Sequence, residues 1–217
     1  DCPDRFIISG FQSLKALSSE PCRPFDMERL GLNLGEAAAT ILLSREVPQR
    51  QTGNIWHISH GFIRNDAFHI SAPSKTSDGL YKALKETCSG IDKEKLAFVN
   101  AHGTATLFND QMESIAIQRA GLADIPINAL KGYFGHTLGA AGVLETILSM
   151  KAVDNHTIIG TRGYQEAGVS GKVDISAENR STDKRSFIKM LSGFGGCNAT
   201  VFVSKDNCTL SAKECFV

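Results

Sequence analysis

A histidine flanked by small and hydroxyl residues follows a short apolar segment. Residues 96–100 are predicted to form a buried strand, and Asn100 to Thr106 reads NAHGTAT. Sites in open α/β sheets usually form where strands end. There, a neutral His102 could donate a hydrogen bond, while Thr104 and Thr106 offer hydroxyls to an amide-bearing ligand. The alternative is a polar capping loop with a satisfied histidine, because polar loops are common.

A second histidine follows a lysine and precedes a run of small residues. Lys131 to Gly142 reads KGYFGHTLGAAG, with Lys131 five residues before His136. We predict a helix at residues 137–150, so that His136 lies at a helix N-terminus, which disfavours imidazolium and keeps the ring a neutral donor. The small residues would let another backbone or a long ligand approach closely. Tight helix packing is the alternative, but it does not require the lysine or the histidine.

A glycine-rich corner, Ser192 to Asn198 (SGFGGCN), separates two apolar segments that we predict to be strands, residues 187–191 and 199–204. Such a turn can point backbone N–H groups at an oxyanion. Judged by itself, the segment is more typical of a hairpin corner with Phe194 tucked into the core.

Two other kinds of site are disfavoured by residue spacing. A zinc site built from His102, His136 and Cys197 would lack the usual short ligand pairs, so no metal is predicted. A nucleophilic role for Cys197 is disfavoured because free cysteines beside strands usually behave as small buried hydrophobes. Among the remaining histidines, only His69, in NDAFHISAP, is expected near a pocket.

The composition limits the class of protein. The 217 residues suffice for one domain or one domain plus a partial one, and 23 Lys+Arg balance 23 Asp+Glu. This balance argues against a nucleic-acid partner or membrane binding by global charge. The six cysteines form no CxxC pair, which favours reduced thiols in a cytoplasmic protein. No segment approaches the roughly 18 consecutive apolar residues of a membrane span.

Alternating strands and helices predict an α/β domain with a layered sheet. Further strands are expected at residues 37–43, 55–63 and 127–130, and further helices from Ser77 or Asp78 to about residue 89 and from Asn109 or Asp110 to about residue 120. The opening residues 1–11 read as the middle of a strand-bearing region, which suggests a piece of a longer protein. Polar breaks at residues 48–53 and 160–171 are candidate boundaries.

Taken together and in this order, NAHGTAT, KGYFGHTLGAAG and SGFGGCN resemble the three C-terminal signatures of the β-ketoacyl synthase family, whose fold is thiolase-like. GFQSLKALS, RPFDMERLGLNLGEAAA and NDAFHISAP extend the resemblance over nearly the whole chain up to Lys205. It implies the end of an N-terminal ketosynthase half at residues 1–50, the C-terminal half at 51–205, and a tail at 206–217.

That family performs a decarboxylative Claisen condensation between an acyl group on a cysteine and a malonyl group on an acyl carrier protein. The resemblance implies that His102 and His136 donate hydrogen bonds to the malonyl thioester carbonyl. It implies that Lys131, with Glu113 as its partner, supports them. None of the cysteines in the chain matches the nucleophile, which is expected upstream of Asp1, so the chain alone is predicted to be inactive.

The resemblance also implies contacts to the substrate. Thr104 and Thr106 match the threonines that contact the phosphopantetheine arm of the carrier protein, and no cofactor is implied to bind directly. The Phe194 backbone N–H would supply half of an oxyanion hole. Additional substrate contacts are expected from His69, Ser71 and Gly195.

The partners and the product are implied less closely. An acyl carrier protein is the expected partner, and the full-length protein is expected to form a homodimer or heterodimer. Leu107 and Asn109 replace a usual proline and glycine, and Ser192 replaces a common phenylalanine. The resemblance implies fatty-acid or polyene/polyketide biosynthesis, and these changes suggest a divergent synthase that makes a polyene or other specialised acyl product. The alternative is a non-catalytic subunit that resembles a chain-length factor or binds a carrier protein, although such a subunit would be expected to lose the histidines first.

Overall fold

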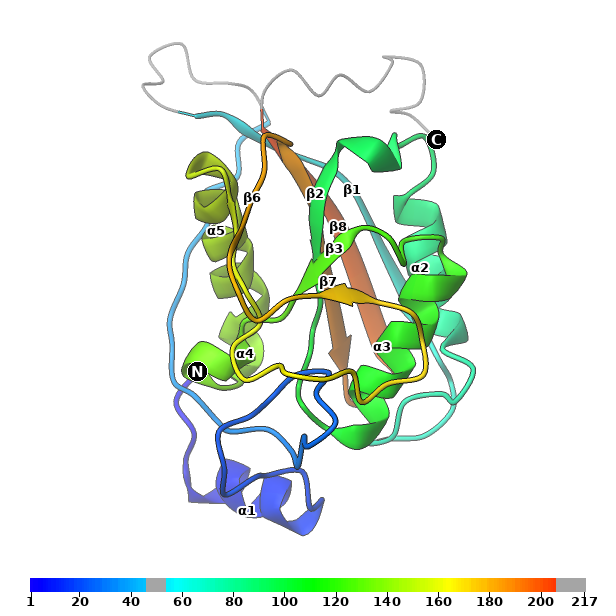
Figure 1. Cartoon of the computed structure of the whole chain (residues 1–217). Helices are drawn as coiled ribbons and strands as arrows, with labels where there is room; N and C mark the ends of the chain where they lie inside the picture. The colour runs from blue at the N-terminus through cyan, green and yellow to red at the C-terminus, as the bar shows by residue number, and fades with distance from the viewer. Residues whose placement is uncertain (46–53, 206–217) are drawn as a thin grey trace.

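A computed structural model describes residues 1–45 and 54–205, and in it the chain forms a six-stranded mixed sheet (Figure 1). The strand order is β1-β8-β7-β2-β3-β5. The strands are β1 (Trp56–Asn65), β2 (Leu96–Asn100), β3 (Pro126–Asn128), β5 (Asp174–Ile175), β7 (Ser186–Gly193) and β8 (Cys197–Lys205), with a separate pair β4 (Thr157–Ile158) and β6 (Arg180–Ser181). The expected boundary at residues 48–53 and the expected tail at 206–217 lie outside the described residues.

The direction of the strands determines where a site can form. β7, β2, β3 and β5 run parallel to one another; β8 pairs antiparallel with β7, and β1 pairs antiparallel with β8 at the edge of the sheet. The carboxyl ends of β2, β3 and β7 therefore meet at one edge of the sheet, toward α1 and α4 in Figure 1. The three segments singled out in the sequence follow these three strands.

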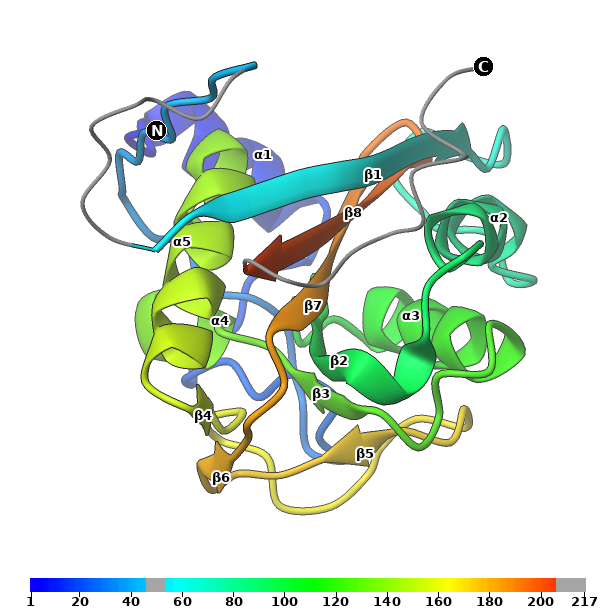
Figure 2. The same ribbon diagram turned by 90° about the horizontal axis from the view of Figure 1, so that it is seen from above.

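Helices cover both faces of the sheet, which confirms the predicted layered α/β architecture (Figure 2). α2 (Asp78–Thr87) and α3 (Leu107–Arg119) pack on one face, and α5 (Ala141–Asp154) packs on the other. Alternate residues of a strand point to opposite faces, so Val99 joins the first core and Phe98 the second. There Phe98 stacks on Phe187 with ring centroids 5.4 Å apart.

The opening of the chain is helical, and the prediction of a strand-bearing region there is wrong. α1 (Arg5–Ser13) begins after Asp4, whose carboxylate accepts a hydrogen bond of 2.8 Å from the backbone N–H of Ile7. Residues 37–43 also form no strand within the described chain. A strand needs a neighbouring strand to pair with, whatever its composition. Ala37 instead exchanges backbone hydrogen bonds with Asp1, which belongs to no strand.

The start of α2 is as predicted, but its capping and the start of α3 differ from the sequence-based prediction. Ser77 occupies the N-cap position of α2, but its side chain makes no capping hydrogen bond, because its hydroxyl donates to the backbone carbonyl of Met112 at 2.8 Å. α3 begins at Leu107, so Asn109 and Asp110 lie inside its first turn. The Asp110 carboxylate instead accepts hydrogen bonds from the backbone N–H groups of Phe25 and Thr104, which lie outside the helix.

The described surface exposes many large apolar side chains. Among the more exposed are Phe6, Leu30, Leu42, Leu43, Ile63, Ile70 and Phe108. None of the helices in the described part of the chain is long and apolar enough to cross a bilayer.

Candidate active site

The loop after β2 holds His102 in the interior, with 4% of the residue exposed. Glu113 of α3 accepts hydrogen bonds of 2.7 Å from the backbone N–H groups of His102 and Gly103, one on each carboxylate oxygen. Burial, followed by the nearby Asp110 carboxylate, raises the pKa of Glu113 to about 7. The helix behind the loop therefore fixes the backbone that carries the histidine.

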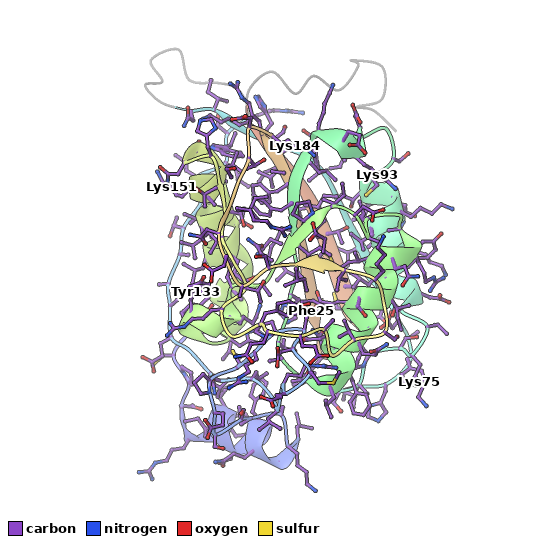
Figure 3. All side chains as sticks on the ribbon, viewed as in Figure 1. Phe25, Lys75, Lys93, Tyr133, Lys151 and Lys184 are labelled. Atoms are coloured by element: carbon purple, nitrogen blue, oxygen red, sulfur yellow. The ribbon has the colours of Figure 1, made fainter. Side chains whose placement is uncertain are left out.

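A glycine is required next to this histidine. Gly103 has φ of +49°, and a Cβ atom there would lie 2.4 Å from the Cβ of Ala129. Asp110 holds the far side of the loop, accepting from the N–H of Thr104 at 3.0 Å and from the N–H of Phe25 at 2.7 Å. Phe25 is fully buried, and Figure 3 shows it in the interior of the ribbon.

Lys131 connects this loop to the opposite layer. It begins the short helix α4 (Lys131–Phe134) after β3, and its buried ammonium donates to the Glu145 carboxylate of α5 at 2.7 Å. The same ammonium donates to the backbone carbonyl of His102 and lies 3.3 Å from the ring atom Nδ1 of His102. The predicted pairing of Lys131 with Glu113 is wrong, because the carboxylate of Glu113 is directed to backbone N–H groups and Glu145 is the partner.

His136 completes a pair of facing imidazoles. Its ring centroid lies 5.0 Å from that of His102, and the ring planes are nearly perpendicular at 80°. The prediction that His136 lies at the start of a long helix is wrong, because a 3-10 turn, η2 (Leu138–Ala140), separates it from α5. The half-buried His136 is instead held by a backbone hydrogen bond of 2.7 Å from its own N–H to the carbonyl of Asn33.

Both histidines present the same ring nitrogen as an acceptor. The backbone N–H of Leu138 donates to Nδ1 of His136 at 3.0 Å, and the Lys131 ammonium, which can only donate, faces Nδ1 of His102. A neutral imidazole that accepts at Nδ1 carries its proton on Nε2. The geometry therefore gives an Nε2–H donor on each of the two neighbouring rings.

Both histidines are also held neutral. Burial, and then the positive charge of Lys131, lower the pKa of His102 well below its usual value and that of His136 to about 3. For His136 the sequence predicts neutrality from a helix N-terminus, whereas in the structure the neutrality of both rings comes from burial and from a neighbouring ammonium.

Sequence patterns do not single out two charged residues of this cluster. Glu145 accepts from Lys131 with one oxygen and from Lys189 of β7 with the other. Burial opposes ionisation of Glu145, but the two ammonium groups outweigh it and lower its pKa. The available signal is Lys189 itself, a lysine in the middle of the apolar strand segment FIKML at residues 187–191.

The two threonines of the histidine loop lie next to each other. The hydroxyls of Thr104 and Thr106 are 2.8 Å apart, with Thr104 buried and Thr106 half-buried. Thr106 also stands at the N-cap position of α3, where its side chain makes no capping hydrogen bond. The pair can offer hydroxyl groups to an amide-bearing ligand that approaches the histidines.

The glycine-rich corner is the turn between β7 and β8. Phe194 is not tucked into the core, because it is 55% exposed and its ring lies 5.7 Å from that of Phe11. The backbone N–H of Gly195 donates to the carbonyl of Ile70 at 2.6 Å, which ties the turn to the loop after β1.

His69 and Ser71 lie on that same loop after β1. The backbone N–H of Ser71 donates to Nδ1 of His69 at 3.2 Å, and His69 is exposed. Within the described residues, no hydrogen bond joins either side chain to His102 or His136. The structure thus brings His102, His136, Lys131 and Glu113 into direct contact, keeps the two threonines on the loop that carries His102, and places the other predicted contacts around the β7–β8 turn.

The small residues after His136 serve helix packing in at least one place. A Cβ atom on Gly142 would lie 2.9 Å from the side chain of Leu191 on β7, so the glycine lets α5 approach the sheet. This observation supports the packing interpretation at that position. It leaves the histidine and the lysine before it unexplained by packing.

The metal site and the cysteine environment considered from the sequence can be compared with the structure. Within residues 1–45 and 54–205, no group of three or more His, Cys, Asp or Glu side chains is arranged to hold a metal ion. Cys197 is exposed, so the expectation of a small buried hydrophobe is wrong there, while Cys22 and Cys88 are buried free thiols. Cys208 and Cys215 lie outside the described residues.

Comparison of the sequence with protein families gives a match to the C-terminal domain of β-ketoacyl synthases over residues 57–165, half of the chain. The 3-oxoacyl-acyl-carrier-protein synthase 2 of Coxiella burnetii is 31% identical, over 91% of this chain and 51% of its own length. The corresponding protein of Rhizobium meliloti is 31% identical, over 93% of this chain and 51% of its own length. The chain thus spans about half the length of these relatives.

Solved structures give the same result. A β-ketoacyl synthase from Burkholderia phymatum superposes with a TM-score of 0.78 at 26% identity, over 94% of this chain and 53% of its own. A ketosynthase from Xenorhabdus doucetiae, solved in complex with its chain length factor, superposes with a TM-score of 0.77 at 29% identity, over 93% and 50%. The chain belongs to the β-ketoacyl synthase family and has the thiolase-like fold of its ketosynthases.

Proposed function

We propose that the full-length protein containing this chain is a 3-oxoacyl-acyl-carrier-protein synthase, which condenses an acyl thioester with malonyl-acyl carrier protein. The observation that carries the proposal is the pair of neutral histidines, one buried and one half-buried, both with Nδ1 occupied and Nε2–H available as a donor. Two neighbouring N–H donors that are shielded from water suit an oxygen atom on which negative charge develops.

The reaction uses these donors in the decarboxylation step. When the malonyl carboxylate leaves as carbon dioxide, the electron pair of the broken C–C bond passes to the α-carbon and onto the thioester oxygen. Hydrogen bonds from His102 and His136 to that oxygen stabilise the enolate more than the starting thioester, so they lower the barrier. The α-carbon then attacks the acyl thioester carbonyl, and the thiolate that held the acyl group leaves.

The other predicted residues have roles in binding on this proposal. Thr104 and Thr106 would contact the amides of the phosphopantetheine arm, and the acyl carrier protein would be the partner that presents it. The backbone N–H of Phe194 would serve the oxyanion of the acyl thioester, with His69, Ser71 and Gly195 nearby. Support comes from the hydroxyl pair beside the histidines and from the turn at the carboxyl end of β7.

The nucleophile is proposed to lie in the part of the full-length protein that this chain does not include. The chain covers about half of each relative, so a condensing site shared between two halves accommodates it. Residues 1–50 would then end the first half and residues 51–205 would form the second. On the same proposal, the full-length protein forms a homodimer or heterodimer. Its product is a fatty acid, polyene or polyketide.

The proposal is tested by measuring carbon dioxide release from malonyl-acyl carrier protein with the full-length protein. His136→Ala removes one donor and is expected to lower the rate by roughly a hundredfold or more. His156→Asn is the matched control, because His156 is exposed, pairs with Asp183 at the surface, and has a positive φ of 53° that asparagine tolerates. Unchanged turnover in His136→Ala would refute the role of the histidine pair.

A second candidate is a non-catalytic subunit that resembles a chain length factor. It is favoured by one observation, namely that a similar ketosynthase was solved in complex with such a factor. That subunit would release no carbon dioxide by itself but would raise the condensation rate of a partner ketosynthase. Reconstitution with and without the partner distinguishes the two functions.

A further inference from the structure

Lys189 is a buried cation to which the proposed chemistry gives no role. It lies in the middle of β7 with 2% of the residue exposed, between Ile188 and Met190, which belong to the apolar core. Its ammonium donates to the second carboxylate oxygen of Glu145 and to the backbone carbonyl of Ala101 at 3.3 Å. Ala101 directly precedes His102, so Lys189 holds the histidine loop from the sheet.

The buried cluster of Lys131, Lys189 and Glu145 contains one more positive charge than is needed to neutralise its carboxylate. Lys131 and Lys189 both pair with Glu145, and the side chains of all three are at most 2% exposed. Burying an ammonium group costs free energy unless it is paired, and a single lysine already neutralises one carboxylate. Glu113 is the other acid that interacts with Lys189, but burial raises its pKa to about 7 and its oxygens accept backbone N–H groups. A second lysine is therefore costly for stability alone.

We propose that Lys189 is a positioning residue of the condensing site, which fixes the backbone before His102 and supplies a positive field that favours negative charge beside the two histidines. This inference rests on the proposed function. The charge of Lys189 acts on both histidines, since it is among the groups that disfavour their imidazolium forms. It therefore favours neutral donors and an enolate oxygen in the same place.

The groups that face Lys189 come from every element around it. They are Glu145 of α5, Lys131 of α4, Glu113 of α3, and the two histidines that follow β2 and α4. Burial, only partly offset by Glu145, lowers the pKa of Lys189 to about 8. The ammonium is thus mostly charged at neutral pH and loses its proton as the pH rises through about 8.

The test compares Lys189→Met with the full-length wild-type protein. Methionine fills a similar volume without charge and leaves the Lys131–Glu145 pair intact, but it removes the donor to one Glu145 oxygen and to the Ala101 carbonyl, so the rate is compared per amount of folded protein, measured by thermal unfolding. The rate of malonyl decarboxylation is expected to fall roughly ten- to a hundredfold, with KM for the malonyl carrier unchanged. The wild-type rate is expected to decline as the pH passes about 8, and the variant is expected to show no such decline.

Ser186→Ala is the control on the same strand, because it removes a buried hydroxyl that donates to the carbonyl of Lys95 at 2.9 Å. It is expected to change stability and to leave the rate and the pH profile as in the wild type. If Lys189→Met keeps the wild-type rate and pH profile, or loses activity only in proportion to lost folded protein, the role assigned to Lys189 is wrong. A wild-type protein that releases no carbon dioxide would refute the proposed function instead.

If the wild-type protein releases no carbon dioxide, the effect of Lys189 on the two histidines is still measurable. The inference then requires that the imidazole pKa of His102 or His136, followed by NMR, rises in Lys189→Met relative to the wild type. Unchanged histidine titration would overturn it.

Discussion

Lys131 and His102 are joined at two points: the lysine ammonium donates to the backbone carbonyl of His102 and lies 3.3 Å from Nδ1 of the same residue. One side chain therefore sets both the backbone position and the tautomer of the histidine. Because the ammonium has no lone pair, Nδ1 must be the unprotonated nitrogen. The proton available to a substrate is then on Nε2.

Replacing Lys131 by methionine tests this relationship. Lys131→Met keeps Glu145 paired with Lys189 but removes the donor to Nδ1 and the charge that lowers the pKa of His102. We expect malonyl decarboxylation by the full-length protein to fall roughly a hundredfold. The pKa of His102 should rise, so the rate should fall off at a higher pH on the acid side.

The matched control for this variant is Lys172→Met, because Lys172 pairs with Asp124 at the surface. Its decarboxylation rate and pH profile should equal those of the wild type. A Lys131→Met protein that retains both would contradict the assignment of Nδ1 as an acceptor from Lys131.

Glu113 is expected to make stability depend on pH. Its folded pKa of about 7 lies above the usual 4.5, so the folded state binds its proton more tightly than the unfolded chain. The stabilisation from this proton is complete below pH 4.5 and is lost as the pH rises through about 7. Over that interval the free energy of unfolding should decrease by about 1.4 kcal/mol for each pH unit. Denaturant unfolding of Glu113→Gln should lack this decrease.

The comparison is between slopes, because glutamine also alters the hydrogen bonds to His102 and Gly103 at every pH. The wild type and the variant should differ in how the free energy of unfolding changes between pH 5 and pH 8. Parallel curves over that range would show that Glu113 is ionised throughout.

Gly103→Ala should be strongly destabilising. The new methyl group would lie 2.4 Å from the Cβ of Ala129, at a φ of +49° that alanine adopts only with strain. Overpacking costs about 1–3 kcal/mol, and the left-handed backbone adds about 1–2 kcal/mol. Gly195→Ala separates the two effects, because φ is +83° there and no atom lies within 4 Å of the added Cβ. Equal losses in denaturant unfolding would mean that the Ala129 contact is relieved without cost.

The local patterns of the sequence predict most of the sheet. Apolar runs of strand length give β2 and, within a few residues, β7 and β8. The pattern fails where tertiary pairing decides the structure, because residues 37–43 have the composition of a strand but no strand beside them. At the N-terminus, the capping signal of Asp4 is present, but the apolar run after it has the composition of a strand as well as of a helix.

The sequence predicts the two histidines and Lys131 of the site, but not which carboxylate pairs with the lysine. The family resemblance favours Glu113 as the partner of Lys131, whereas the fold brings Glu145 from a helix on the opposite face of the sheet. Which carboxylate reaches a buried ammonium depends on how layers stack, and spacing along the chain does not reveal it. The sequence does not indicate that Lys189 belongs to the site, because the residues around it have the pattern of an apolar strand.

The protonation of the two histidines is measured most directly by nitrogen NMR of the full-length protein labelled at histidine. His102 and His136 should both remain neutral from pH 8 down to pH 5, with the proton on Nε2, since the pKa of His136 is about 3 and that of His102 is well below its usual value. An imidazolium signal from either ring in this range, or a proton on Nδ1, would contradict the paired-donor site.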